Sequence, residues 1–132
     1  MKKMLLVAAA LGVAAFGQDE AEFSKWMKPL GPQMKKFGAA LEAKDKAEML
    51  TTGKLLKDSY TKTKTYFAGK NAAGAVALAD KSLAAVEAML SSLNADNMDK
   101  AVSDAAAVRG TCKPCHDQYR ERTPEGQYKI KL

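Results

Sequence analysis

Apolar residues recur along this chain with the period of an α-helix, in four successive blocks that follow Glu20. In the first block the spacing alternates between four and three residues, which places the apolar side chains on one face of a helix. These residues are Phe23, Met27, Leu30, Met34, Phe37 and Leu41. Pro29 and Pro32 interrupt the block, and a proline inside a helix removes a hydrogen bond and clashes with the preceding turn. A kink or a broken turn is therefore expected near them, and because the spacing continues past both prolines, the pattern favours a bent helix over two unrelated helices.

Short polar segments separate the four blocks and contain helix-capping residues. Asp45 followed by Glu48 is typical of a helix start, and the turn 68–71 ends that helix. Amphipathic helices of about 20 residues joined by such short turns run antiparallel to their neighbours. The predicted fold class is therefore all-α, an antiparallel up-down-up-down four-helix bundle. In the last helix, Pro114 predicts a local distortion between Gly110 and Pro114.

The N-terminal segment has the residue order of a secretory signal peptide. Two lysines near the start are followed by an apolar run that ends in small residues, and we expect cleavage after Gly17 and export to the periplasm. The run is too short to cross a membrane, so we expect a mature protein that is not membrane-spanning. The predicted parts are residues 1–17 as signal peptide, 18–122 as the helical domain, and 123–132 as a C-terminal tail that is extended on the surface or disordered.

The charge of the chain is moderately basic. The 132 residues carry a formal net charge of +6, and removal of the signal peptide takes away Lys2 and Lys3. The basic residues are spread along the chain and are not interleaved with aromatic residues, so we expect no nucleic-acid partner. The sequence also shows no nucleophile paired with a histidine base and no acidic cluster that could hold a metal ion. We therefore do not expect an enzyme.

The segment from Cys112 to His116 is the part of the sequence that most directly indicates a chemical function. Two cysteines lie three positions apart and a histidine follows the second one, which is the attachment sequence of a c-type haem. The two thiols can add across the two vinyl groups of one porphyrin, and His116 can then coordinate the iron. The cysteines also fall on the apolar face of the last helix, so the sequence predicts one covalent haem c inside the bundle.

Three other uses of this motif compete with haem attachment. A closed zinc site needs four ligands of the Cys or His type, and the chain has two cysteines and one histidine. A thioredoxin-like dithiol lies near a βαβ pattern, whereas the surroundings here are alanine-rich and helical. The third use is a disulfide between the two cysteines. The protein would then be a helical module without haem, and this hypothesis stays open.

Taken with the predicted export and the four helices, a single CxxCH motif near the C-terminus makes the chain resemble the class II c-type cytochromes. This family includes cytochrome c′ and cytochrome c556, and the resemblance covers the whole chain after the signal peptide. The segment from His116 to Arg120 is similar to the family pattern, in which an aromatic and a basic residue follow the motif. The resemblance implies that Cys112 and Cys115 form the haem thioethers, that His116 is the proximal iron ligand, and that Arg120 lies near the proximal face. Family members are often homodimers through their first two helices.

The resemblance also implies where the sixth iron ligand lies. The distal residue of the family is on the first helix, and in c556-like members it is a methionine often followed by lysine. Met27 with Lys28 is similar to that pattern, so Met27 is the expected distal ligand and Met34 the runner-up, with Trp26 and Leu30 completing the haem pocket. The chain departs from the family four positions earlier, where a basic residue is common. The basic partner expected for a haem propionate is therefore missing at that position.

The expected function depends on this ligand. With Met27 on the iron no coordination position is free, and the protein is a c556-like electron carrier of the periplasm. Nearby lysines could then steer an acidic redox partner, namely Lys25, Lys28, Lys35 and Lys36. Without Met27 on the iron, an apolar pocket would lie over an open position and admit small neutral gases such as NO and CO, as in cytochrome c′.

Overall fold

The computed structural model describes the backbone of residues 14–132 and the side chains from Glu20 onward. Most of the expected signal peptide lies outside the described residues and stays a prediction. The described elements are α1 (Ala14–Met27), α2 (Leu30–Ala43), α3 (Lys46–Gly69), α4 (Ala73–Asn94), α5 (Met98–Gly110), α6 (Cys112–Tyr119), β1 (Arg120–Arg122) and β2 (Tyr128–Ile130).

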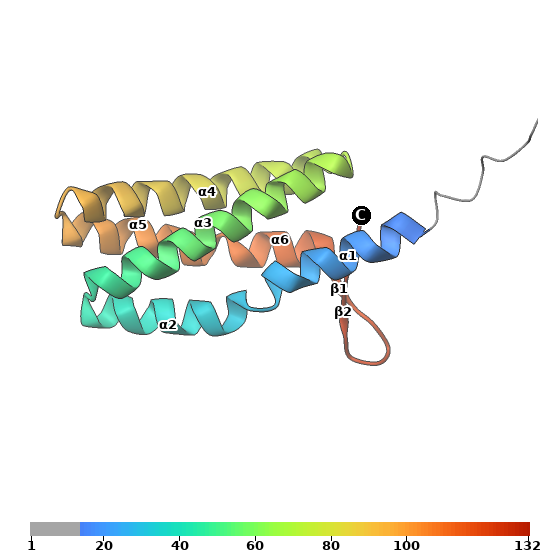
Figure 1. Ribbon diagram of the computed structural model, residues 1–132, viewed down its shortest axis with the longest axis horizontal. Helices are drawn as coiled ribbons and strands as arrows, with labels where there is room; N and C mark the ends of the chain where they lie inside the picture. Colours follow the sequence, from blue (N-terminus) through green and yellow to red (C-terminus); the bar gives the residue numbers. More distant parts are fainter. Residues whose placement is uncertain (1–13) are drawn as a thin grey trace, which may run out of the picture.

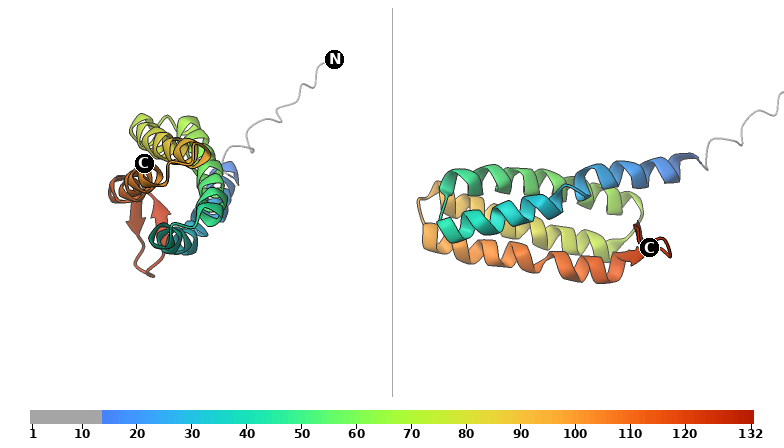
Figure 2. Two further views of the ribbon diagram at one scale, coloured as in Figure 1. Left: turned by 90° about the vertical axis from the view of Figure 1, so that its left-hand side faces the viewer. Right: turned by 90° about the horizontal axis from the view of Figure 1, so that it is seen from below.

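The helices form four antiparallel arms, which confirms the predicted all-α bundle. Helices α1 and α2 follow one another as the first arm, α3 and α4 are the second and third, and α5 continues into α6 as the fourth (Figure 1). The end-on view in Figure 2 shows the arms arranged around a common axis. Among the residues described, no helix is both long enough and apolar enough to cross a membrane.

The first arm is broken near the prolines, where a kink or a broken turn was expected. Helix α1 ends at Met27 and α2 begins at Leu30, with a turn between them. Pro29 cannot donate a helical hydrogen bond, and its ring crowds the preceding turn. Pro32 lies in the first turn of α2, where backbone N–H groups have no partner within the helix in any case. The apolar face nevertheless continues across the break, because Phe23 and Leu30 are both buried.

Helix α3 follows its sequence pattern closely. The Asp45 carboxylate accepts a hydrogen bond from the Glu48 N–H at 3.1 Å, as the capping residues predicted. Met49, Leu56 and Phe67 on the predicted apolar face are buried. At Gly53 a Cβ atom would lie 2.6 Å from Met89 Cε and 2.8 Å from Leu90 Cδ2, so the absence of a side chain lets α4 approach closely. The seam between α3 and α4 is the most extensive helix contact of the bundle.

The fourth arm has the distortion predicted from Pro114. Helix α5 ends at Gly110 and α6 begins at Cys112, and between them the Thr111 hydroxyl donates to the Val108 carbonyl at 2.8 Å. Pro114 falls in the first turn of α6, where the N–H it lacks would have no helical partner. The motif therefore begins a new helix instead of lying inside one.

The C-terminal segment folds back as a hairpin that begins before Arg122, the residue at which the helical domain was expected to end. Helix α6 ends at Tyr119, and β1 pairs antiparallel with β2 around a turn in which Gly126 has a φ of 80°. The Ile130 N–H donates to the Glu20 carboxylate at 2.8 Å, which ties the hairpin to α1. The hairpin includes residues from both sides of the domain boundary expected after Arg122.

Candidate functional site

Cys112 and Cys115 are the first and fourth residues of α6, so their side chains lie on the same face of this helix. Both thiols are free and half-buried. The hydroxyl of Tyr60, a buried residue of α3, lies 3.8 Å from Cys112 Sγ. The structure thus places the first cysteine of the motif against the centre of α3, on the inner side of the bundle.

Burial shifts the pKa values of two residues of the motif, Cys115 and His116. It raises the pKa of the Cys115 thiol, and the neighbouring Cys112 adds to the effect. Burial also lowers the pKa of His116, with the positive charge of Arg120 acting in the same direction and Asp117 opposing both. His116 is therefore neutral at pH 7, and a neutral imidazole is the form that coordinates a metal. The effect of Arg120 on His116 shows that these two predicted residues are near each other.

Tyr119 holds the end of α6 against α3 and α4. Its ring lies 5.5 Å from that of Phe67, centroid to centroid. Its hydroxyl reaches the backbone of Gly74 so closely that a Cβ at this position would lie 2.2 Å from the oxygen. Gly74 therefore makes room for Tyr119, and the pair fixes the turn of helix that carries His116.

The residues predicted on the distal side come from the break between α1 and α2. Leu30 is buried in a central cluster that also contains Tyr60 and Val108. Met27 packs against this central cluster and also against an aromatic cluster around Phe23. Because Tyr60 of this cluster lies 3.8 Å from Cys112 Sγ, the cluster against which Met27 packs extends to the motif.

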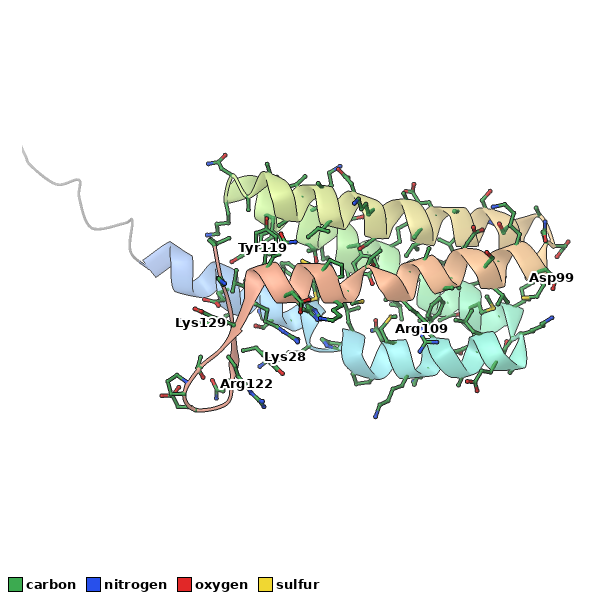
Figure 3. The ribbon with its side chains drawn as sticks, turned by 180° about the vertical axis from the view of Figure 1, so that it is seen from behind. Lys28, Asp99, Arg109, Tyr119, Arg122 and Lys129 are labelled. Carbon is green, nitrogen blue, oxygen red and sulfur yellow. The ribbon has the colours of Figure 1, made fainter. Side chains whose placement is uncertain are left out.

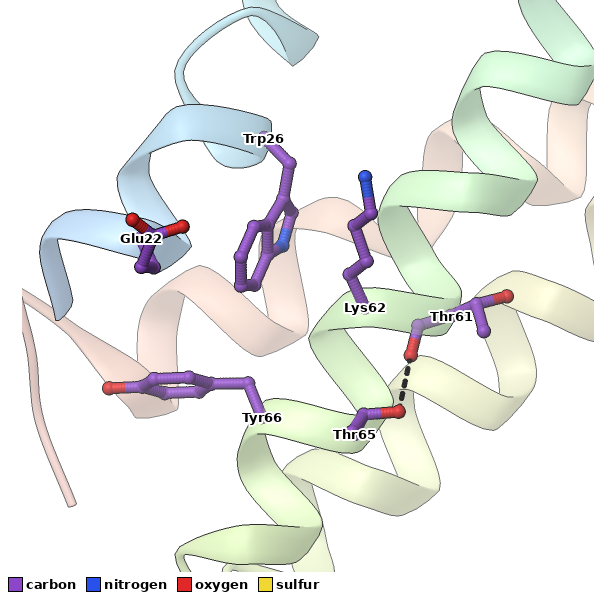
Figure 4. A pocket seen from close by; sticks show the side chains of 6 residues that line it. All are labelled: Glu22, Trp26, Thr61, Lys62, Thr65 and Tyr66. Carbon is purple, nitrogen blue, oxygen red and sulfur yellow. Dashed lines mark hydrogen bonds between the residues drawn. The ribbon is translucent and has the colours of Figure 1, made fainter. Parts of the chain in front are cut away.

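Trp26 is directed toward α3. It is half-buried, and its indole Nε1 donates to the Thr63 hydroxyl at 3.1 Å. The ring lines a cavity of about 290 Å³ between α1 and α3, together with Glu22, Thr61, Lys62, Thr65 and Tyr66 (Figure 4). The role of Trp26 in a haem pocket stays a prediction.

A second cavity, of about 470 Å³, opens between α2 and α5. Met34 and the glycines Gly31 and Gly38 line it from α2, and Arg109 lines it from α5. On the same helix α2, the side-chain oxygen of Gln33 is buried and has no hydrogen-bond partner within the described part of the chain. These features show that protein side chains do not fill the space between the first and fourth arms completely.

The donor set of the site fits a covalently bound haem. It combines two free thiols on one helix face, an imidazole kept neutral by its surroundings, and the thioethers of Met27 and Met34 on the opposite arm. Among the described side chains, which begin at Glu20, no group of three or more His, Cys, Asp or Glu residues converges.

Sequence reasoning missed two residues of the site, Tyr60 and Gly74. Nothing in the sequence indicated that Tyr60 would face a cysteine 52 positions away. Gly74 gave no signal beyond its lack of a side chain.

No family model, curated protein or solved structure matches this chain. The resemblance to class II c-type cytochromes therefore rests on the motif, its position and the helical pattern.

Proposed function

We propose that this chain is an exported monohaem c-type cytochrome that carries electrons. Cys112 and Cys115 would hold the haem through two thioethers, and His116 and Met27 would coordinate its iron. One observation carries the proposal: two free, half-buried thiols share one face of α6, directly beside a histidine whose pKa is lowered by burial. When bound, the haem supplies an iron that takes up and releases one electron.

The side chains around the motif would fix the cofactor and keep water away from it. The common face of Cys112 and Cys115 directs both sulfur atoms to one side of α6. The neutral imidazole of His116 offers a lone pair, and the contacts of Tyr119 with Phe67 and Gly74 hold the helical turn that orients it. These residues bind and position the group without taking part in acid–base chemistry.

Met27 is the stronger candidate for the sixth ligand. It lies at the end of α1 and packs against both apolar clusters near the motif, whereas Met34 packs against the central cluster alone. A thioether on the iron raises its reduction potential and leaves no open position, which suits an electron carrier. The alternative, a binder of NO or CO with an open sixth position, is supported by the cavity of about 470 Å³ beside Met34, which gives small molecules room next to α2.

Absorption spectra distinguish the two ligand assignments. We would record the oxidised and reduced spectra of the purified protein, with and without CO, for the wild type, for Met27→Ala and for the matched control Met34→Ala. We expect a sharp reduced α-band that CO does not alter in the wild type and in Met34→Ala, and CO binding in Met27→Ala. A broad high-spin spectrum that shifts with CO in all three proteins would overturn Met27 ligation and favour the gas binder.

A further inference from the structure

The cations of the bundle fall into two groups, according to whether they have a carboxylate partner. On α3 and α4, Lys57 pairs with Glu87 at 3.5 Å, Lys62 with Asp58 at 2.8 Å and Lys64 with Asp80 at 2.6 Å. Lys54 and Lys81 are the exceptions on these two helices. Most positive charges of this side of the molecule are thus offset locally, which leaves a weak electric field there.

The opposite side has the pairs Lys113–Asp117 and Lys129–Glu121, and it also carries cations without carboxylate partners among the described residues. They are exposed and come from four separate segments. We call them the basic face: Lys28, Lys35, Arg109, Arg120 and Arg122. Figure 3 shows Lys28, Arg109 and Arg122 along the side where α5 and α6 face α2. Lys35 and Arg109 also line the same cavity, where Glu42 is the one acidic side chain.

Two arginines of the basic face are held in place by an exposed tyrosine of the hairpin. The guanidinium carbon of Arg120 lies 4.0 Å from the centroid of the Tyr128 ring, and that of Arg122 lies 5.5 Å from it. These cation–π contacts keep the two guanidinium groups side by side on one strand. Because they are already ordered, they lose less conformational entropy when they bind carboxylates.

The basic face lies around the motif helix. Arg109 precedes Cys112 by three residues, and Arg120 follows His116 by four, so one arginine lies about one turn beyond each end of the motif. We propose that the basic face docks an acidic surface of a partner protein against α6. Its role in electron transfer rests on the proposed function, because docking there would bring the partner next to the haem. Lys25, one of the lysines expected to contribute, is paired with Glu22 at 2.5 Å and does not belong to this face.

An acidic protein fits the basic face better than a membrane surface does. Helices that bind at membrane surfaces bury an apolar face between the lipids. Among the described side chains, the large hydrophobic ones that are exposed are Leu55, Tyr128 and Leu132. Leu55 lies on α3, and Tyr128 and Leu132 lie in the C-terminal segment. Among the described side chains, the helices that carry the basic face, α2 and α5, therefore expose no large apolar residue that could anchor them in a membrane. The cavity between α2 and α5 would instead accommodate a protruding acidic surface of a partner protein.

The test compares two double variants that remove the same charge from opposite sides. Arg109→Gln with Arg122→Gln changes the basic face, and Lys57→Gln with Lys64→Gln changes paired cations of α3. The probe is a fluorescein-labelled polyglutamate peptide, whose binding to the full mature protein is measured by fluorescence anisotropy. At an ionic strength of 0.1 M the Debye length is about 10 Å, so charges near the bound peptide count more than the net charge does.

We expect the basic-face variant to weaken polyglutamate binding by about fivefold and the control variant by less than about twofold. An equal loss in both variants would show that net charge alone attracts the peptide and would overturn the proposal. Sedimentation with vesicles of phosphatidylcholine and phosphatidylglycerol tests the membrane alternative. Vesicle binding that depends on the basic face, together with polyglutamate binding that does not, would also overturn it.

The same samples separate this proposal from the proposed function. An absorption spectrum shows whether each protein carries haem. Selective loss of polyglutamate binding in a protein that carries no haem would contradict the cytochrome assignment but support the basic face as a docking site for an acidic partner. Haem in all samples together with an equal loss in both variants would contradict the docking surface alone.

Discussion

The two sides of this bundle differ in how completely they bury their side chains. At the seam of α3 and α4, Leu56, Val86 and Met89 are fully inaccessible to solvent. On the side formed by α1, α2 and α6, Cys112, Cys115, His116 and Met34 are only half-buried, and a cavity separates α2 from α5. Dense packing in one region supplies the stability that lets the other region keep reactive side chains and open space. The CxxCH motif thus lies on the side of the bundle that is packed less completely.

The largest expected effect on stability comes from replacing a methionine by alanine on the densely packed side, and it is compared with the same replacement on the other side. Met89→Ala removes a fully buried side chain at the seam of α3 and α4, and we expect it to lower the free energy of unfolding by about 3 kcal/mol. Met34→Ala removes a half-buried side chain beside a cavity, and we expect a loss of about 1 kcal/mol. Urea denaturation followed by circular dichroism measures both. Equal losses would show that the two sides are packed alike.

An intermediate effect concerns the contact between Gly74 and Tyr119, which links α4 of the dense side to the motif helix. Gly74→Ala places a methyl group against the tyrosine hydroxyl, and we expect a loss of about 1 kcal/mol despite the better helix propensity of alanine. Tyr119→Phe in the same chain removes the clashing oxygen and should restore most of the stability. Thermal denaturation of the two single variants and the double variant tests this. Absence of rescue would mean that the cost of Gly74→Ala arises elsewhere.

The smallest effect compares two lysine–aspartate pairs of the fourth arm. Asp104 accepts a hydrogen bond from Ser92 of α4 at 2.7 Å, and chiefly this bond, assisted by Lys100, lowers its pKa below the usual 3.8. A lowered pKa in the folded state contributes stability above the unfolded-state pKa, and this stability is lost as the pH falls through the folded-state value. We expect Asp104→Asn to cost at most about 1 kcal/mol at pH 7 and progressively less as the pH falls below 3.8.

The control for this experiment is Asp117→Asn, which breaks the pair of Asp117 with Lys113 on α6. This pair is exposed, with 58% and 82% of the two side chains accessible, so its loss should hardly change stability. Urea denaturation at pH 7 and pH 3 measures both variants. A cost of Asp104→Asn that stays constant with pH would contradict a role for the ionised carboxylate.

Local patterns predicted the dense side of the bundle well. The cap at Asp45 and the spacing of the apolar residues were enough to place α3, because both act within one helix. The sequence placed a disruption near Pro29 but did not decide between a bend and a break, since a helix can bend or end at a proline and packing with α3 decides between these outcomes. The hairpin was missed for a similar reason, because its position depends on a hydrogen bond from Ile130 to Glu20, 110 residues away.

In the candidate site, too, local sequence predicted some features, whereas others depend on how the helices pack. The sequence named Cys112, Cys115 and His116 because their spacing is a local signature. It could not indicate that Tyr60 would face Cys112, or that Trp26 would donate to Thr63, because both contacts join separate helices. The unpaired cations of the basic face were also beyond local reasoning, since a charge is free or paired only in the context of the folded chain.

The central claim is that α6 carries a covalent haem, and the intact mass of the protein tests it most directly. We would express the full chain in the periplasm of a host that has the haem-attachment machinery. The mass would be measured by electrospray under denaturing conditions, for the wild type and for Cys112→Ser with Cys115→Ser. The account predicts that the wild type gains the mass of one haem and that the double variant does not. A wild-type mass equal to that of the polypeptide alone, or lower by two hydrogens as in a disulfide, would contradict it.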